Sequence, residues 1–229
     1  MAKVYIGVGH GGSDSGAIKY LVEKDINLKI ALACRDYLKA AGVDVKISRT
    51  TDKDSSITEK VTAANSWGAD LAIDIHNNAG GGDGAEVYHS IVGGTGKRLA
   101  DYILSEFEKI GQNVRGAKTK PENGTDYFGF IRLTDMPAVI TEAVFVDNAA
   151  DSAQADTDAE CKAFGIAIAK GVLRTLGIAY NVWPSTPSKP AQTIYRVQVG
   201  AYTNRSNAVK LAKKLNSIGY KTLIVKGEK

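Results

Sequence analysis

The spacing of hydrophobic and polar positions changes several times along the first 178 residues and predicts alternating strands and helices. In residues 69–78, Leu71, Ile73 and Ile75 are apolar at alternate positions, and the run ends at His76 with two asparagines behind it. This pattern is typical of a buried strand that gives way to a polar loop. Further strands are predicted at 4–8, 43–48, 84–90, 128–133 and 137–141, and helices at 23–41, 57–67, 95–110 and 161–176.

Strands that alternate with helices of this length predict an α/β fold. We expect a mostly parallel or mixed sheet with helices on both faces. The pattern changes at residues 179–192, which hold three of the five prolines and are predicted to be a linker. Residues 193–229 then predict a small β-α-β module, with strands at 195–202 and 220–226 and a helix at 204–218.

The charge distribution also separates the two parts of the chain. Residues 1–180 carry 20 basic and 24 acidic residues, whereas residues 181–229 carry 9 basic residues and 1 acidic residue. A basic tail on a mildly acidic body indicates modules with different partners, and anionic polymers are one candidate for the tail. No nucleic-acid partner is expected. The two cysteines, Cys34 and Cys161, are too few for a disulfide framework and are expected to be reduced.

Nothing in the chain predicts a membrane span or an export signal. No apolar run approaches the roughly 20 residues that a spanning helix needs. The N-terminal apolar run has the character of a first strand rather than of a signal peptide. We therefore expect the protein to stay in the cytoplasm until cell lysis releases it.

Three polar side chains follow apolar runs and predict a site at one edge of the sheet. They are His10, His76 and Glu142, and Glu23 opens the helix after the first strand. The carboxyl ends of parallel strands meet at one edge, where ligands bind. Two histidines and one carboxylate with a vacant fourth position are typical of a catalytic zinc site. Glu142 would then be free to act as a base.

Each of these residues also has an ordinary structural interpretation. A single histidine after a strand is commonly a hydrogen-bonded loop residue, Glu23 suits the first turn of a helix, and Glu142 alone could be a solvated strand end. No compact H-E-x-x-H motif supports the metal site. The third histidine, His89, lies within a predicted strand and is expected to be structural.

Two glycine-rich segments resemble nucleotide-binding motifs only weakly. Residues 7–12 match G-x-G-x-x-G, but a polar loop follows where the dinucleotide fingerprint needs a helix. No acidic residue ends the second strand either. Residues 94–97 (G-T-G-K) lack the earlier glycine of a phosphate loop, and Arg98 stands where a magnesium-binding Ser or Thr belongs. Neither segment predicts a nucleotide site.

Six dispersed motifs resemble those of the zinc-dependent N-acetylmuramoyl-L-alanine amidases, the amidase type 3 family. The resemblance extends over about residues 3–178, with the motifs in the family's order. Two departures are visible: many members have D-P-G-H-G-G where this chain has Gly7-Val8-Gly9-His10, and many have Ser at the position of Asp74. The motifs are G-H-G-G-x-D-x-G-A at 9–17, E-K-D-I-N-L at 23–28, S-R-T-x-D at 48–52, A-A-N at 63–65, D-I-H-N-N at 74–78 and P-A-V-I-T-E-A-V-F-V-D-N at 137–148.

The resemblance implies His10, Glu23 and His76 as ligands of one zinc ion and Glu142 as the catalytic acid and base. It implies hydrolysis of the amide between N-acetylmuramic acid and L-alanine in peptidoglycan. We expect Gly11, Asn77 and Asn78 to position the substrate. Two alternatives share parts of the evidence: a zinc peptidase that cuts within the stem peptide, and a non-catalytic protein that binds peptidoglycan.

The basic tail is similar to a sporulation-related (SPOR) repeat, a module that binds peptidoglycan. Residues 195–215 (Y-R-V-Q-V-G-A-Y-T-N-R-S-N-A-V-K-L-A-K-K-L) carry the likeness. The module normally has two such repeats, and this chain contains one. The resemblance therefore implies a catalytic domain at 1–178, a linker at 179–192 and a partial wall-binding module at 193–229.

Overall fold

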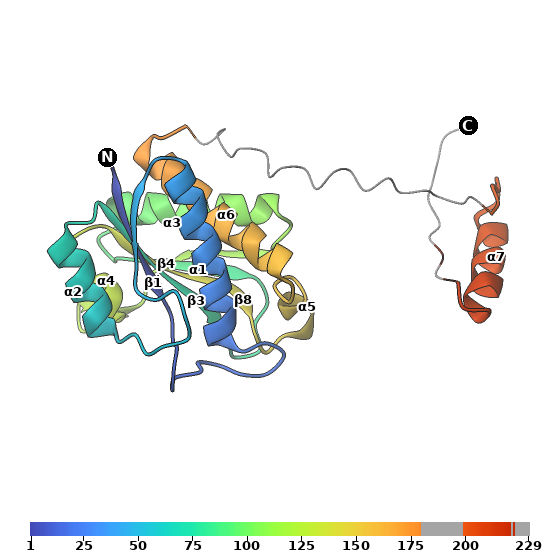
Figure 1. The fold of residues 1–229 in the computed structure, drawn as a ribbon, viewed down its shortest axis with the longest axis horizontal. Helices are drawn as coiled ribbons and strands as arrows, with labels where there is room; N and C mark the ends of the chain where they lie inside the picture. Colours follow the sequence, from blue (N-terminus) through green and yellow to red (C-terminus); the bar gives the residue numbers. More distant parts are fainter. Residues whose placement is uncertain (180–198, 221, 223–229) are drawn as a thin grey trace. The chain divides into compact units, whose positions relative to one another are not determined.

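The computed structural model describes residues 1–179, 199–220 and 222. The chain divides into two units, Met1–Pro184 and Ser185–Lys229. The first unit holds a sheet with helices on both faces, and the described part of the second contains helix α7 (Arg205–Ser217) (Figure 1). Asn204 caps α7 by accepting a hydrogen bond from the backbone N–H of Ser206, as expected for a helix N-cap.

The central sheet has six strands in the order β2-β1-β3-β8-β4-β5. Strands β1, β2, β3 and β8 are parallel, whereas β4 is antiparallel to β8 and parallel to β5. This confirms the predicted mostly parallel, mixed sheet. The strands are β1 (Lys3–Val8), β2 (Asp44–Ile47), β3 (Leu71–Asn78), β4 (Ala85–His89), β5 (Val114–Lys118) and β8 (Ala138–Phe145), with a separate hairpin of β6 (Pro121–Glu122) and β7 (Thr125–Asp126).

Helices cover both faces of the sheet, and the alternation along the strands explains why. Ile73 of β3 packs in one core cluster with Ile30, whereas its neighbour Ala72 packs in a second cluster with Phe130. Successive strand residues point to opposite faces, so an apolar run needs a covering layer on each side. One face is covered by α1 (Glu23–Ala40), α3 (Gly94–Lys109) and α6 (Asp158–Leu176), the other by α2 (Ile57–Trp67) and α4 (Gly129–Leu133), and α5 (Ala149–Ser152) follows β8.

Local signals set the ends of helices α2 and α6. Helix α2 begins with a capping box, in which Ser56 and Glu59 each accept a hydrogen bond from the other's backbone N–H. It ends at Gly68, whose φ of 65° is left-handed and is accessible to glycine without a steric penalty. Helix α6 repeats the arrangement with Thr157, Glu160 and a C-terminal glycine.

Two predicted elements differ from the structure. Residues 129–133 form helix α4 rather than a strand; five residues with mixed aromatic and apolar side chains carry no resolvable period. Strand β8 continues to Phe145, so Glu142 lies within the strand and not at its end. The residues that follow Glu142 are apolar, and they extend the strand beyond this carboxylate. For the strands predicted at 195–202 and 220–226, residues 195–198, 221 and 223–226 lie outside the described residues, and the described residues 199–202, 220 and 222 form no strand.

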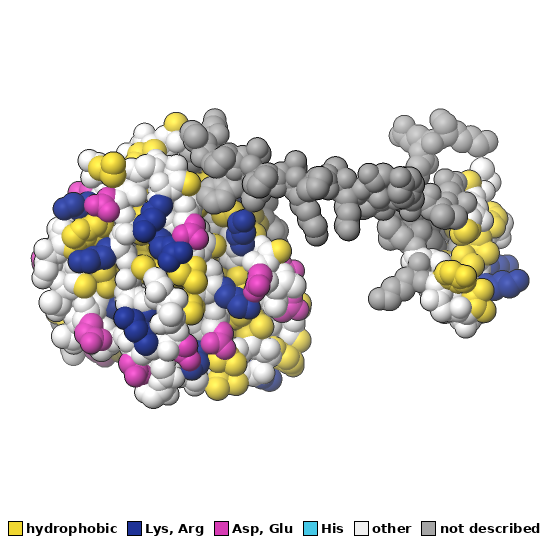
Figure 2. Space-filling model, viewed as in Figure 1, with side chains coloured by type: hydrophobic (Ala, Val, Ile, Leu, Met, Phe, Trp, Pro, Cys, Tyr) yellow, Lys and Arg dark blue, Asp and Glu magenta, His cyan; other side chains and the backbone are white. Residues whose placement is uncertain are grey.

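The surface of the first unit is charged, and its cysteines are buried. Figure 2 shows basic and acidic side chains intermingled over the visible face of this unit. Cys34 and Cys161 are free thiols inside the core. Within the described ranges, no helix combines the length and the apolar character needed to cross a bilayer.

Candidate metal centre

His10 lies in a tight loop that follows β1. The backbone of His10, Gly11 and Gly12 has φ angles of 57°, 134° and 57°. Positive φ is uncommon for residues with a Cβ, and glycine adopts it readily. A Cβ at Gly11 would also lie 2.2 Å from the backbone oxygen of Lys53. The two glycines therefore let the chain reverse and direct the His10 imidazole back over the edge of the sheet.

A buried arginine holds this loop from behind. Arg49 is only 1% exposed, and its Nη2 donates to the backbone oxygens of Gly9 at 3.0 Å and Lys24 at 2.8 Å. Asn27 donates to the same Gly9 oxygen at 3.1 Å. Hydrogen bonds from a charged donor are stronger than neutral ones. Arg49 thus joins the His10 loop to the first turn of α1.

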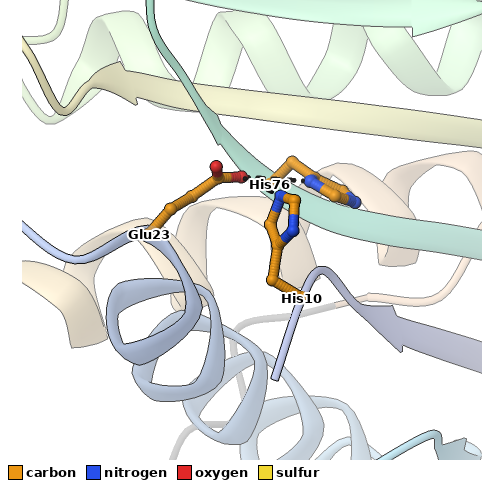
Figure 3. Close-up of side chains that lie close together, drawn as sticks. All are labelled: His10, Glu23 and His76. Carbon is orange, nitrogen blue, oxygen red and sulfur yellow. Dashed lines mark hydrogen bonds and ion pairs between the residues drawn. The ribbon is translucent and has the colours of Figure 1, made fainter. Parts of the chain in front are cut away.

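Glu23 and the two histidines point toward one another (Figure 3). Glu23 Oε1 lies 3.1 Å from His10 Nε2 and 3.1 Å from His76 Nδ1. One ligand atom from each residue can be chosen so that all three lie within 4.8 Å of one another. The sequence prediction that these distant residues converge agrees with this geometry.

The remaining imidazole nitrogens contact carboxylates. His10 Nδ1 lies 2.8 Å from Asp14 Oδ2, and His76 Nε2 lies 3.4 Å from Asp74 Oδ2. A carboxylate on the far nitrogen of a metal-binding histidine fixes the ring orientation and the tautomer. Lys60 extends this network of contacts, because its Nζ lies 2.7 Å from Asp74 Oδ2 and both side chains are buried. Sequence reasoning identified neither Asp14 nor Lys60.

The three residues fit a divalent cation. Imidazole nitrogen and carboxylate oxygen are the donors that such ions take in proteins. Burial alone would raise the pKa of Glu23, but hydrogen bonds from His10 and His76 hold that pKa well below its usual range. The carboxylate is therefore ionised and points between two nitrogens. His10, Glu23 and His76 form a possible metal-binding group.

Glu142 lies beside this group. It is paired in register with His76 across β3 and β8, and its Oε2 is buried with no hydrogen-bond partner among the described residues. Burial raises the pKa of Glu142 to about 8, and the charge of Glu23 adds to the effect. A carboxyl with one buried, unpartnered oxygen and a shifted pKa, next to a possible metal group, is a candidate acid–base residue.

The other predicted site residues have different surroundings. Asn77 is 3% exposed, donates to Asn27 Oδ1 at 2.8 Å and accepts from the backbone N–H of Val144 at 3.1 Å. Gly11 is buried and its backbone is paired with Asp14. Asn78 is half-buried and accepts from the backbone N–H of Ala79. All three residues bond within the protein, but Gly11 and Asn77 are buried, whereas Asn78 is partly exposed at the end of β3.

The arrangement defines a class of protein. Three possible metal ligands beside a buried carboxyl, at the carboxyl edge of a mostly parallel sheet, are typical of a hydrolytic enzyme. Comparison with known proteins identifies the family. The model of the N-acetylmuramoyl-L-alanine amidase family matches residues 4–174, and that of the SPOR domain matches residues 167–226. The chain belongs to the N-acetylmuramoyl-L-alanine amidase family.

Two curated relatives align over nearly the whole chain. The N-acetylmuramoyl-L-alanine amidase CwlM of Bacillus licheniformis is 39% identical over 232 residues, covering 98% of this chain and 85% of the relative. The sporulation-specific N-acetylmuramoyl-L-alanine amidase of Bacillus subtilis is 35% identical over 230 residues, with the same coverage of 98% and 85%. The sequence-based identification of the family is confirmed.

Solved structures share the fold. Cwp6 from Clostridium difficile is 36% identical with a TM-score of 0.75, covering 76% of this chain and 29% of that one. The catalytic domain of the amidase CwlV from Bacillus (Paenibacillus) polymyxa is 28% identical with a TM-score of 0.71, covering 78% of this chain and all 100% of that domain. The residues that match the amidase family, 4–174, lie within the first unit.

Proposed function

We propose that this amidase hydrolyses the bond between the lactyl group of N-acetylmuramic acid and L-alanine with one zinc ion held by His10, Glu23 and His76. The observation that carries the proposal is the convergence of these three residues, whose ligand atoms all lie within 4.8 Å of one another. Three protein ligands leave a position free for substrate or water, as in catalytic zinc sites. A zinc ion bound there would polarise the scissile carbonyl and acidify a bound water.

Glu142 would transfer the proton in this reaction. Hydrolysis adds water across the amide, so the proton that leaves the attacking water must reach the nitrogen of the departing L-alanine. Glu142 lies one strand from His76 and has a buried oxygen without a hydrogen-bond partner in the described part of the chain, which suits a carboxylate that exchanges protons with substrate. Its pKa of about 8 falls when a cation binds nearby, so the loaded site would hold it as a base.

Neighbouring residues would orient the proposed zinc ligands and Glu142. Asp14 and Asp74 contact the far nitrogens of His10 and His76, which leaves His10 Nε2 and His76 Nδ1 to face the metal position. Asn77 joins α1 to β8 through its two hydrogen bonds. We assign it to positioning, and Asn78 is the better candidate for substrate contact.

We also propose the domain division expected from the sequence: a catalytic domain at 1–178, a linker at 179–192 and a partial SPOR-like module at 193–229. The SPOR match over residues 167–226 supports peptidoglycan binding by the tail. The excess of 9 basic residues over 1 acidic residue in 181–229 makes anionic wall polymers a second ligand to test. Release by cell lysis stays a prediction, which cell fractionation would test.

The test identifies both the metal and the bond. Purified full-length protein is incubated with isolated cell walls, and released fragments are analysed by mass spectrometry. We expect free amino groups on L-alanine, loss of activity with a chelator, and recovery with zinc. Fragments cut within the stem peptide would instead favour a peptidase, and binding without any cleavage would favour a non-catalytic wall-binding protein.

A further inference from the structure

A second charged cluster lies beside Glu142, on the opposite side from His76. Glu86 of β4 is paired in register with Glu142 of β8, and its side chain is 4% exposed. Because β4 is antiparallel to β8, the start of β4 lies at the edge that carries the metal centre. Glu86 therefore continues the row that His76 and Glu142 form across the sheet.

Two cations from β5 reach this buried carboxylate. Arg115 Nε and Lys118 Nζ both contact Glu86 Oε1, the lysine at 2.5 Å. The other oxygen, Oε2, accepts from the hydroxyl of Tyr88 at 3.0 Å and from Asn78 Nδ2 at 3.4 Å. One positive charge would neutralise Glu86. With two, the cluster retains a net positive charge.

The cationic groups are partly open to solvent. The side chain of Arg115 is 43% exposed and that of Lys118 is 32% exposed. Among the described residues, the two Nη groups of Arg115 make no hydrogen bond, and its guanidinium lies 5.4 Å from the ring centroid of Phe145. The hydrogen bond from Nε to Glu86 thus holds Arg115 in place. Its two Nη groups remain available to bind another carboxylate, and a guanidinium can do so with two parallel hydrogen bonds.

The cluster lies close enough to the metal centre to contact the same substrate. Neighbouring strands are about 4.8 Å apart, so the backbone at Glu86 is roughly 10 Å from the backbone at His76, two strands away. An extended peptide advances about 3.3–3.6 Å per residue. A group two or three residues from the scissile amide would therefore reach Arg115 and Lys118.

The chemistry of the proposed substrate indicates which of its groups would bind Arg115 and Lys118. On the sugar side, N-acetyl and hydroxyl groups are neutral, and the lactyl carboxyl is consumed in the scissile amide. On the other side the peptide carries free carboxylates. We propose that Arg115 and Lys118 form a cationic subsite that binds a carboxylate of the stem peptide on the leaving-group side of the scissile amide. The proposal rests on the amidase function proposed above.

The first arm of the test changes the substrate. The zinc-loaded full-length chain is given a soluble N-acetylmuramoyl peptide, or the same peptide with its carboxylates converted to carboxamides, and kcat/KM is measured by chromatography. We expect the carboxylate form to be preferred by about tenfold or more, with a preference that falls as salt is added. Equal kcat/KM for the two forms would overturn the subsite. Failure to cleave either form would overturn the amidase proposal itself, and the subsite with it.

The second arm changes the protein. Arg115→Gln/Lys118→Gln removes the cations, and adding Glu86→Gln gives a variant without an unpaired buried carboxylate. Both variants should lose most of the preference, so that the ratio of the two kcat/KM values approaches one. The matched control, Lys97→Gln/Arg98→Gln, removes the same charge from an exposed part of α3 and should keep the preference. A preference retained in the triple variant, or lost equally in the control, would overturn the proposal.

Discussion

The buried ion pair between Lys60 and Asp74 gives the sharpest test of how the metal centre is supported. Lys60 Nζ lies 2.9 Å and 2.7 Å from the two oxygens of Asp74, and the side chains are 3% and 2% exposed. Asp74 also lies 3.4 Å from His76. We predict that Lys60→Met strongly destabilises the protein, because it leaves a carboxylate buried without its main counter-charge.

The size of the effect follows from burial. Removing one partner of a buried pair costs about 3–5 kcal/mol of unfolding free energy. In a domain of this size, each kcal/mol lowers the melting temperature by roughly 2–4 °C, so a decrease of about 6–20 °C is expected. Replacing both partners, as in Lys60→Met/Asp74→Asn, should cost less than either single change, since no buried charge is then unpaired.

The assay is urea unfolding of the full-length chain followed by far-UV circular dichroism, for the two single variants and the double variant. The pH dependence has a definite sign. Burial would raise the pKa of Asp74, but Lys60 and His76 hold that pKa below its usual range. The stabilisation is therefore present above about pH 4 and is lost as the pH falls further. A cost below about 1 kcal/mol for Lys60→Met, or additive single variants, would refute this reasoning.

Further predictions concern the site itself. Glu142→Gln should keep the metal but lower kcat by about 10²- to 10⁴-fold, as measured by metal analysis alongside wall digestion; normal turnover would contradict the acid–base role. His10→Ala and His76→Ala should lose zinc together with activity, and a variant that lacks zinc yet digests walls would refute the ligand assignment. Hydrogen bonds to Glu23 and Asp14 raise the pKa of His10, and although burial lowers the pKa of His76, Asp74 and Glu23 raise it to about 10. Zinc binding to the metal-free chain should therefore release protons and weaken as the pH falls, which calorimetry in buffers of different ionisation enthalpy would detect; binding independent of pH would contradict this. Asn77→Ala should lower the free energy of unfolding by about 1–3 kcal/mol with little change in KM, whereas a raised KM at unchanged stability would indicate substrate contact.

Much of the fold could be predicted because hydrophobic periodicity is strong in its central elements. Ile26, Ile30 and Cys34 recur at helical spacing and lie on the buried side of α1. Leu71, Ile73 and Ile75 alternate and are buried in β3. Burial on one stripe or on alternate positions is the pattern that sequence reasoning detects best.

The two elements that differ from the sequence prediction, α4 and the end of β8, each have a local physical explanation. Residues 129–133 are too few to show a period, and their helix is held by packing of Phe130 and Ile131 in the core. The sequence predicts too early an end for β8, because a carboxylate inside a buried strand resembles a strand end. Glu142 is a local exception to the hydrophobic pattern, and such exceptions concentrate at functional sites.

Residues around the candidate metal centre are harder to predict from sequence than its proposed ligands. The sequence around Lys60 gives no indication that this lysine is buried. Its side chain is buried in the fold, where it forms an ion pair with Asp74 of β3. A signal did exist: an aspartate within the apolar run of β3 needs a buried counter-charge. Likewise, no sequence pattern predicts that β4 aligns Glu86 with Glu142, because an antiparallel register is set by tertiary contacts.

The most direct test of the metal centre is a crystal structure of zinc-loaded, active protein with anomalous data collected on both sides of the zinc absorption edge. One anomalous peak should lie between His10 Nε2, His76 Nδ1 and the Glu23 carboxylate, at about 2.0–2.2 Å from each ligand atom. An active crystal with no peak there, or with the only zinc bound elsewhere, would contradict the account.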